Sequence, residues 1–561
     1  MTQTSARQVT HPQPRSTHEV TNQAPPRVDV NEFTSQRVLR DGVGAFGAAW
    51  AVPHLESVGE LVGSAAFQTD ARTAHRSEPV LRTHDRWGHR VDEVDYDPAY
   101  HRIISAAVAH GAHTSAWAQP RPGAHVARAA TFMLFAQVEP GHACPISMTH
   151  AAVPSLRTTP DLAERWLPRL FSTEYDGRLA APSAKPGALV GMAMTEKQGG
   201  SDVRANTTRG EHVGDGDYLL TGHKWFCSAP MSDAFLVLAQ TSRGGTEEGI
   251  SCLLVPRVLE DGTPNVFRIQ RLKDKLGNRS NASSEVELDG TVGHLVGEPG
   301  RGVRTIIEMV ARTRLDCVLG STAGMRQSVA EALWHVRHRS AFGATLVDQP
   351  AMTAVVADLA LEAEAATLTS LRLAQAHEDD ASDQDVAFTR LATAVAKYWI
   401  CKRGPHHSYE ALECLGGNGY TEDFPLAMRY REQPVMAVWE GSGNVIALDV
   451  LRSMSREPET VEAVLAELAL AEGQHPDYDA HLKRVRRLLA DAARQDHGTL
   501  QAGARRLTEA LALALQASLM IRHATAYSSN AFAVARLGED RGSQYGVLPA
   551  GADLTAILSR H

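Results

Sequence analysis

Cysteine is scarce in this chain, and its few copies are scattered. The six are Cys144, Cys227, Cys252, Cys317, Cys401 and Cys414, and none forms a C-x-x-C pair. Disulfide frameworks and zinc sites both need clustered or regularly spaced cysteines. The pattern therefore predicts buried free thiols in a reducing cytoplasm and no metal site.

Long apolar runs and an excess of positive charge are also missing. No stretch approaches about 18 uninterrupted apolar residues, so no membrane span is expected. The net charge of −9 gives the whole chain no electrostatic attraction to nucleic acid, although a local Lys/Arg cluster could still bind it. The chain does have length: 561 residues, 43% hydrophobic and 22% charged, predict a globular protein of three or four folding units.

Composition and hydrophobic periodicity divide the chain into five parts. Residues 1–36, rich in Thr, Gln, Pro and Arg, predict a flexible arm, because they lack the apolar centre of a secretory signal. Residues 37–189 are largely helical, and residues 190–300 form a β unit of short strands separated by Gly, Asp and Ser turns. Residues 301–452 show the periodicity of a helical bundle, and residues 453–561 add a helical tail rich in Ala and Leu.

Two glycine and proline patterns need separate interpretation. The segment 42–47 (GVGAFG) matches the dinucleotide pattern G-x-G-x-x-G but follows no plausible buried strand, so we interpret it as an ordinary loop. Pro405 falls within a long helical stretch and is expected to kink or interrupt that helix.

Two motifs in the β unit suit a flavin. In MTEKQGGSDV (194–203) the glycines let the backbone approach a ligand, and Thr195 and Ser201 offer hydroxyls. A surface turn with capping residues explains this motif equally well. The segment TGHKWFCS (221–228) places aromatic rings beside a hydroxyl, although an aromatic strand is more often simply core.

Three further motifs lie at helix ends in the bundle. In RSAFG (339–343) an Arg could hold a phosphate or complement a helix dipole, and the glycines of ECLGGNGY (413–420) could expose backbone N–H groups or simply cap a helix. In WEGSGN (439–444) Glu440 follows Trp439, and a carboxylate in apolar surroundings has the raised pKa that a general base needs. Taken alone, the pattern favours an acid that complements a helix dipole.

The order and spacing of these motifs resemble the acyl-CoA dehydrogenase family from about residue 40 to 452, and most closely its AidB-like, alkylation-response subfamily. MTEKQGGSDV, GHKWF, LKDKLGNRSNAS (272–283) and WEGSGNVIALDVL (439–451) carry the resemblance, and the helical tail is a further trait of the subfamily. The resemblance implies a mainly α, α+β fold. Its parts would be an N-terminal helical domain, a middle β-barrel-like domain, a C-terminal four-helix bundle and an extra C-terminal helical domain.

The resemblance also implies FAD, bound between the β unit and the bundle and completed by a neighbouring subunit of a homotetramer built as a dimer of dimers. The implied catalytic residues are Glu440 and Arg314. The implied cofactor-binding residues are Met194, Thr195, Gly200, Ser201, Phe226, Ser228, Arg339, Phe342, Gln349, Glu413, Gly417, Ser442 and Asn444.

Three functions follow from these expectations. The first is α,β-dehydrogenation of a short or branched acyl thioester, with Glu440 removing the α-proton and hydride passing to flavin N5. The second is a DNA-binding, alkylation-response flavoprotein that protects double-stranded DNA, although the balanced charge of the tail favours a solvated charged surface as the explanation of the basic cluster. The third is a flavin oxidase or monooxygenase acting on a substrate without CoA. The candidate DNA-binding residues are Lys483, Arg484, Arg486 and Arg487, followed by Arg494, Arg505 and Arg506.

Overall fold

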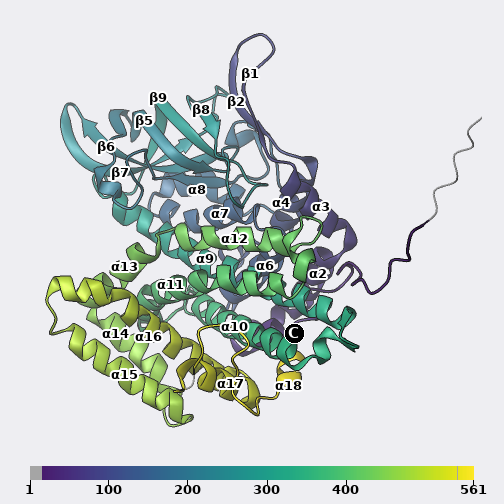
Figure 1. The fold of residues 1–561 in the computed structure, drawn as a ribbon. Coiled ribbons are helices and arrows are strands. Elements are labelled where there is room, and N and C mark those ends of the chain that lie inside the picture. Colours follow the sequence, from purple (N-terminus) through teal and green to yellow (C-terminus); the bar gives the residue numbers. More distant parts are fainter. Residues whose placement is uncertain (1–15, 540) are drawn as a thin grey trace, which may run out of the picture.

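The computed structural model describes residues 16–539 and 541–561, so the prediction of a flexible arm lies outside the described residues for positions 1–15. The described chain has a mainly helical N-terminal region, a middle sheet, a bundle of long helices and a further helical layer at its C-terminal end (Figure 1). This order matches the mainly α, α+β architecture predicted from the sequence.

The N-terminal region is mainly helical but contains one hairpin that the sequence did not predict. The elements are α1 (Arg37–Ala45), η1 (Ala49–Ala51), α2 (Val52–Gly63), α3 (Ala65–Arg76), β1 (Val80–His84), β2 (Arg90–Asp95), α4 (Pro98–Ala109), α5 (Ser115–Ala118), α6 (Ala124–Val138), α7 (Ala143–Leu156), α8 (Pro160–Leu170) and η2 (Pro182–Ala184). The hairpin β1–β2 is rich in charge, which concealed its alternating pattern. It is attached to the sheet domain because Asp92 Oδ1 accepts from the backbone N–H of Ile269 at 2.9 Å.

The second half of the expected arm makes specific contacts. Trp334 Nε1 donates to the carbonyl of Pro25 at 2.8 Å. Asn22 exchanges two hydrogen bonds of 2.8 Å with the backbone of Ser340. Arg27 and Glu32 form a buried ion pair. Residues from Asn22 onward therefore lie along the bundle, held by buried polar groups that their composition did not reveal.

The middle domain is a small barrel of mainly antiparallel strands. Its elements are β3 (Val190–Ala193), η3 (Val203–Ala205), β4 (Arg209–Gly214), β5 (Asp217–Ser228), β6 (Ala234–Arg243), β7 (Thr246–Pro256), β8 (Arg268–Leu272) and β9 (Ser283–Val296). The pairing order β6-β4-β5-β9-β7 closes because β7 also pairs with β6, while β8 adds to β9. Closure removes most exposed sheet edges and gives the domain its own apolar core.

The bundle is built from the longest helices. Its elements are α9 (Gly302–His338), β10 (Ser340–Ala341), β11 (Ala344–Thr345), η4 (Leu346–Asp348), α10 (Pro350–Gln375), α11 (Asp383–Glu413), η5 (Gly416–Tyr420), α12 (Leu426–Val438) and α13 (Gly443–Arg456). All fifteen residues of α6 are buried, and α6 is anchored to α9 by the buried pair of Arg128 and Asp316, whose Nη2 and Oδ2 atoms lie 2.9 Å apart.

Two local predictions were wrong in part. Pro405 does not interrupt its helix, because α11 continues through it to Glu413. Gly47 lies beyond the end of α1, but Gly42 and Gly44 lie within that helix rather than in a loop, and Gly42 fits closely against Leu371, which a Cβ atom would approach to 2.6 Å. Tight helix packing, not a ligand, therefore explains that glycine.

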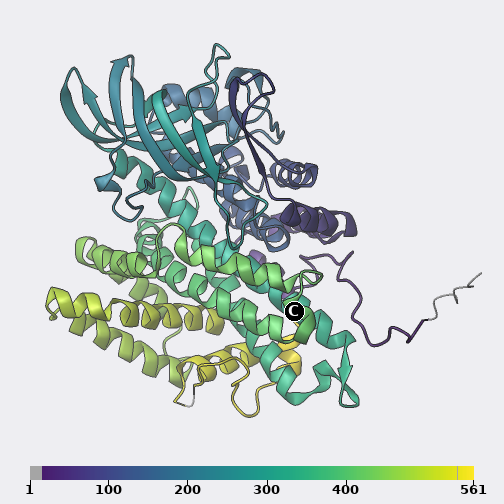
Figure 2. The ribbon, with the colours of Figure 1, turned by 45° about the horizontal axis from the view of Figure 1, so that its top comes forward.

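The C-terminal helices cover the side of the bundle that faces away from the barrel (Figure 2). They are α14 (Pro458–Ala469), α15 (Pro476–Ala492), α16 (His497–His523), α17 (Ala526–Leu537) and α18 (Leu554–Leu558). Long α16 has a continuous buried face from Ala504 to Met520 that merges with the bundle core. Among the described helices, none has the length and apolar character needed to cross a bilayer.

Candidate functional site

The MTEKQGGSDV motif leaves the sheet as a loop between two strands that share one edge. β3 pairs with β6 from Ala234 to Val237, and β4 pairs with the same edge from Gln240 to Ser242. Residues 194–208 therefore bulge out of the barrel opposite Leu238 and Ala239. This excursion is the reason the motif is available to a ligand rather than bonded into the sheet.

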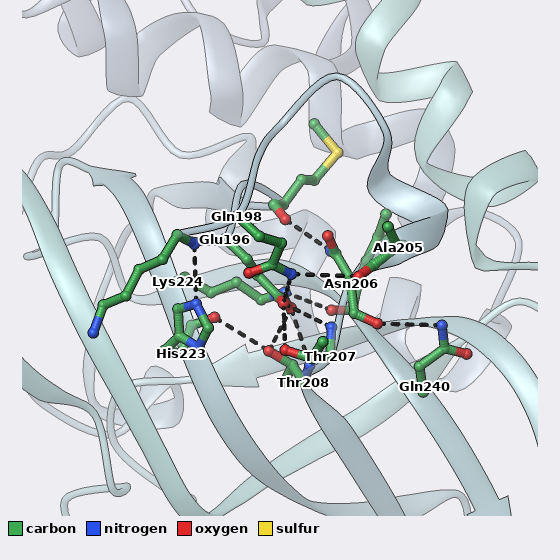
Figure 3. A network of polar contacts seen from close by, with 12 residues as sticks. Glu196, Gln198, Ala205, Asn206, Thr207, Thr208, His223, Lys224 and Gln240 are labelled. Atoms are coloured by element: carbon green, nitrogen blue, oxygen red, sulfur yellow. Dashed lines mark hydrogen bonds and ion pairs between the residues drawn. The ribbon is translucent and has the colours of Figure 1, made fainter.

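Glu196 holds this loop in shape through a buried polar network (Figure 3). Its side chain is fully buried, and it accepts hydrogen bonds from the backbone and side chains of Thr207 and Thr208 at 2.6–3.1 Å. Lys224 Nζ lies 2.9 Å from Glu196 Oε1 and also donates to the carbonyl of Leu238 at 2.7 Å. Although burial alone would raise it, the pKa of Glu196 is held well below its usual value by Lys224 and these donors.

This network of Glu196, Lys224 and the two threonines, called the clamp below, leaves hydroxyl groups of the loop free for a ligand. Within the described part of the chain, the hydroxyls of Thr195 and Ser201 make no hydrogen bond, and Ser201 is exposed. Gly199 has open space where a side chain would stand. Gly200 lies so close to Thr195 that a Cβ atom would be 2.5 Å from the Thr195 hydroxyl. Both glycines therefore shape a surface that can be approached closely.

The end of β5 lies beside this loop. The backbone N–H of Trp225 donates to the carbonyl of Thr195 at 2.9 Å, which places Met194 and Thr195 next to Phe226 and Ser228. Phe226 is 45% exposed, so much of the apolar surface of its ring is open to solvent. The Ser228 and Ser283 hydroxyls are 2.9 Å apart. The predicted cofactor residues of the barrel thus form one continuous surface.

Glu440 lies at the turn between α12 and α13 with a left-handed backbone, φ +58°. Two cations hold the backbone of this turn. Arg314 Nε donates to the Glu440 carbonyl at 3.1 Å, and Lys397 Nζ donates to the Gly441 carbonyl. Arg314 is fixed in turn by Asp449, whose Oδ2 lies 2.6 Å from Arg314 Nη1. Arg314 therefore contacts the Glu440 main chain, which makes it a positioning residue in this structure.

The Glu440 carboxyl has the electrostatic character of a base. Burial raises its pKa, while a hydrogen bond from Thr313 and the charges of Arg314 and Lys397 oppose that rise. A raised pKa makes the carboxylate a stronger base, which is the direction that a general base needs.

Cys144, at the start of α7, connects Glu440 with the barrel surface. Burial raises the pKa of its thiol to about 11, the Glu440 carboxylate adds to the rise, and Lys275 and the Ser228 hydroxyl oppose it. Glu440 of the bundle and Ser228 of the barrel thus both influence the pKa of the Cys144 thiol. Sequence reasoning did not place Cys144 or Lys275 at the site: Cys144 was noted only as a free thiol, and Lys275 only as part of the 272–283 motif.

A second group of predicted residues lies at the far end of the bundle. The α9 helix separates Arg314 from His338 by 24 residues, about 36 Å at 1.5 Å per residue. Beyond it, Phe342 is fully exposed with φ +52°, Arg339 donates to the carbonyl of Asn22, and Gln349 donates to the carbonyl of Ala341 at 3.1 Å.

Glu413 and Gly417 lie at this same far end of the bundle. The Ser328 and Ser408 hydroxyls, 3.0 Å apart, fix α9 and α11 side by side, so both helices end there. Gly417 is exposed, with open space around its Cα. One chain therefore does not bring these residues to Glu440.

Two other predicted residues lie on the first turn of α13. Ser442 is its N-cap and makes no side-chain cap hydrogen bond, and Asn444 Oδ1 accepts from Arg505 Nε at 2.8 Å. Asn444 therefore links the bundle to the C-terminal layer, while Ser442 remains available.

The basic residues of the tail are only partly free. Arg486 forms an ion pair with Glu472 at 2.6 Å, and Arg505 contacts Asn444. Arg541, Arg506 and Arg487 add to burial in lowering the pKa of Arg484, which marks a group of mutually repelling guanidinium groups. No cluster of His, Cys, Asp or Glu capable of holding a metal occurs among the described residues, and the six cysteines are free.

The donor set fits FAD. Open glycine positions, unbonded hydroxyls at Thr195 and Ser201, and the exposed Phe226 ring are suited to a flavin and its polar substituents. The remote residues offer Arg339 and exposed backbone at Gly417, which are suited to a phosphate-bearing group.

Comparison with known families agrees with this arrangement. The AidB N-terminal domain matches residues 22–177, the acyl-CoA dehydrogenase middle domain matches residues 191–291, and the acyl-CoA dehydrogenase C-terminal domain matches residues 300–455.

Individual relatives match over most of their length. AidB of Escherichia coli (strain K12) is 44% identical over 85% of this chain and 88% of its own. Acyl-CoA dehydrogenase family member 11 of Caenorhabditis elegans is 29% identical over 81% of this chain and 77% of its own. The crystal structure of C. elegans ACDH-11 in complex with C11-CoA is 26% identical, with a TM-score of 0.84 over 95% of this chain and 94% of that one.

These matches cover all three domains that build the site, in the same order along the chain. The chain therefore belongs to the acyl-CoA dehydrogenase family, as an FAD-dependent oxidoreductase of the branch that carries an AidB N-terminal domain.

Proposed function

We propose that the protein oxidises a short or branched acyl thioester to its α,β-unsaturated form, with Glu440 as the base. The observation that carries the proposal is the position of Glu440 at the turn before α13, where Arg314 and Lys397 hold the main chain and burial raises the pKa of the carboxyl. A fixed carboxylate whose pKa is raised is what removal of an α-proton requires.

Each residue of the site would have a separate role in the proposed reaction. Glu440 takes the α-proton, and its raised pKa makes it a stronger base than an exposed carboxylate. FAD, when bound, supplies at N5 the acceptor for the hydride that leaves the β-carbon. Thr195, Ser201, Phe226 and Ser228 would hold the cofactor from the barrel side, while Ser442 would contribute from the α13 turn. The C11-CoA complex of the C. elegans relative supports a CoA thioester as the substrate class.

A partner subunit would complete the site. Phe342 is fully exposed at the tip of a turn, with Arg339 and Gly417 at the same end of the bundle and about 36 Å from Arg314. An exposed aromatic ring beside an Arg is typical of an interface anchor. We propose a homotetramer, a dimer of dimers, in which this end contacts the cofactor of a neighbour. The free cysteines support the cytoplasm as its compartment.

An anaerobic titration with acyl-CoAs tests the activity. Straight-chain and branched thioesters should be added separately while the flavin absorbance is followed. The proposal expects bleaching by at least one short or branched acyl-CoA. Reduced enzyme that then reacts rapidly with oxygen would instead favour an oxidase or monooxygenase. If no thioester bleaches the flavin, the dehydrogenase proposal fails.

Binding to double-stranded DNA is a second candidate function. The specific observation that favours it is the group of Arg487, Arg506 and Arg541 around Arg484, which adds to burial in lowering the pKa of Arg484 while Glu509 opposes it; such a cationic group would attract a phosphate backbone. Affinity for a duplex, measured by fluorescence anisotropy, should fall steeply with salt and depend little on sequence. Replacing Arg484 and Arg506 with Ala should reduce the salt slope by about two units. Arg209→Ala, on the barrel, is the matched control, and a duplex that does not bind at low salt excludes this function.

A further inference from the structure

A cavity of about 390 Å³ lies between the hairpin, α4 and the barrel, outside the proposed flavin surface. Its volume is within the usual range for small-molecule sites. Ala229 and Pro145 form part of its wall, and they directly follow Ser228 and Cys144 in the chain. The cavity is thus close to the flavin surface, but none of the residues proposed to hold the flavin lines it.

Aromatic rings line much of this cavity. Tyr96 and Tyr100 stack with centroids 4.5 Å apart and an interplanar angle of 15°. His101 and Tyr175 stack beside them at 5.9 Å, and His101 Nδ1 lies 3.0 Å from the Tyr175 hydroxyl. Rings in this arrangement present flat apolar surface together with polar edges.

One buried hydroxyl in the cavity wall lacks a partner. Ser232 is 2% exposed, and its Oγ makes no hydrogen bond in the described structure. Burying a hydroxyl without a partner is costly, so this group would gain a hydrogen bond from a polar ligand in the cavity. The turn that carries it begins at Ala229, whose φ of +50° is a strained conformation of the kind found at binding sites.

The charges around the cavity are already compensated. Lys185 Nζ lies 2.5 Å from Asp233 Oδ1, and Arg178 Nη2 lies 2.6 Å from Asp176 Oδ2. Glu93 and Asp95, at the hairpin edge of the cavity, share Arg82 as their ion-pair partner. A charged ligand would have to compete with these pairs, whereas a neutral one would leave them intact.

We propose that this cavity is a second ligand site that takes a small neutral aromatic molecule bearing a hydroxyl or carbonyl group. The stacked tyrosines would pack against the ring, and Ser232 would hydrogen-bond the polar substituent. Because none of the residues proposed to hold the flavin lines this cavity, the site can be occupied together with an acyl-CoA.

Binding of resorcinol to the holoenzyme tests this proposal, with ligand-observed NMR to measure affinity. Saturable binding is expected, with benzoate and benzylamine binding more weakly because they carry charge. Saturating acyl-CoA should not displace resorcinol. Absence of saturable binding, stronger binding of either charged analogue, or displacement by acyl-CoA would each overturn the proposal.

Two variants locate the binding. Ser232→Ala removes a hydroxyl without a partner, so thermal stability and flavin content should be unchanged while resorcinol binds about five- to tenfold more weakly. Gly177→Val narrows the cavity, because a Cβ atom at Gly177 would lie 2.8 Å from the Tyr175 hydroxyl, and it should abolish binding. Wild-type affinity in both variants would place the ligand elsewhere and refute the assignment.

Discussion

Replacing Glu196 with Gln tests whether one buried carboxylate holds the loop that carries the cofactor motif. The change preserves size, removes the charge that faces Lys224 Nζ at 2.9 Å, and turns an acceptor into a donor that faces Thr207 and Thr208. Removing one partner from a buried ion pair costs about 3–5 kcal/mol, because the other charge stays buried. We therefore expect the free energy of unfolding to fall by about 3–5 kcal/mol.

Urea denaturation followed by circular dichroism measures this loss, and the flavin absorbance of the purified protein reports the loop. The free energy of unfolding and the flavin absorbance should both decrease. The absorbance falls because the loop carries Thr195 and Ser201, which would hold the cofactor. The matched control is Glu211→Gln on the exposed face of β4, which should change stability by less than about 0.5 kcal/mol. Equal stability of the two variants would refute the role given to the clamp.

The difference in stability between wild type and Glu196→Gln should depend on pH in a defined way. The folded-state pKa of Glu196 lies below the unfolded value of about 4.3, so its stabilising contribution is present above that pH. It is lost as the pH falls through the folded-state pKa. The difference in stability between wild type and Glu196→Gln should therefore be constant at neutral pH and shrink only in strong acid.

Three further changes probe the rest of the site. Thr313→Val removes a hydrogen bond that lowers the pKa of Glu440. The acidic limb of the pH profile of kcat/KM should therefore move up by about 0.4–1 pH unit. An acidic limb that does not move would contradict this. Phe342→Ser alters a fully exposed ring, so thermal stability of the fold should be retained while sedimentation shows smaller assemblies with less FAD; an unchanged assembly would exclude Phe342 as an anchor. Asp449→Asn loosens Arg314 and with it the Glu440 turn, so kcat should fall more than KM rises, whereas a pure KM effect would argue against positioning.

The sequence was sufficient for the architecture because long periodic helices and a turn-rich β unit have distinct signatures. The order of the parts and the family were predicted correctly. The hairpin β1–β2 was missed because Val80 is exposed and Asp92 is buried, so its short strands lack a clear apolar alternation. Pro405 does not interrupt α11, because tertiary packing along the helix overrides a local breaker signal.

The site was only partly predictable, because it is assembled from residues far apart in the chain. Motifs indicated Thr195, Ser228 and Glu440, but Lys397 and Cys144 lie in ordinary helical sequence and gain their position only through packing. Glu196 could be quoted as part of a motif, yet its role as a clamp depends on the gap between β3 and β4, which the sequence does not display.

The central claim is that Glu440 is the base of a flavin-dependent oxidation, and its most direct test is the anaerobic reduction of Glu440→Gln by an acyl-CoA that bleaches the wild-type flavin. The variant should retain FAD, since its barrel residues are intact. Its rate of flavin bleaching should fall by about 10²–10⁴-fold, the usual contribution of a general base. Bleaching of the Glu440→Gln flavin at the wild-type rate would contradict the account.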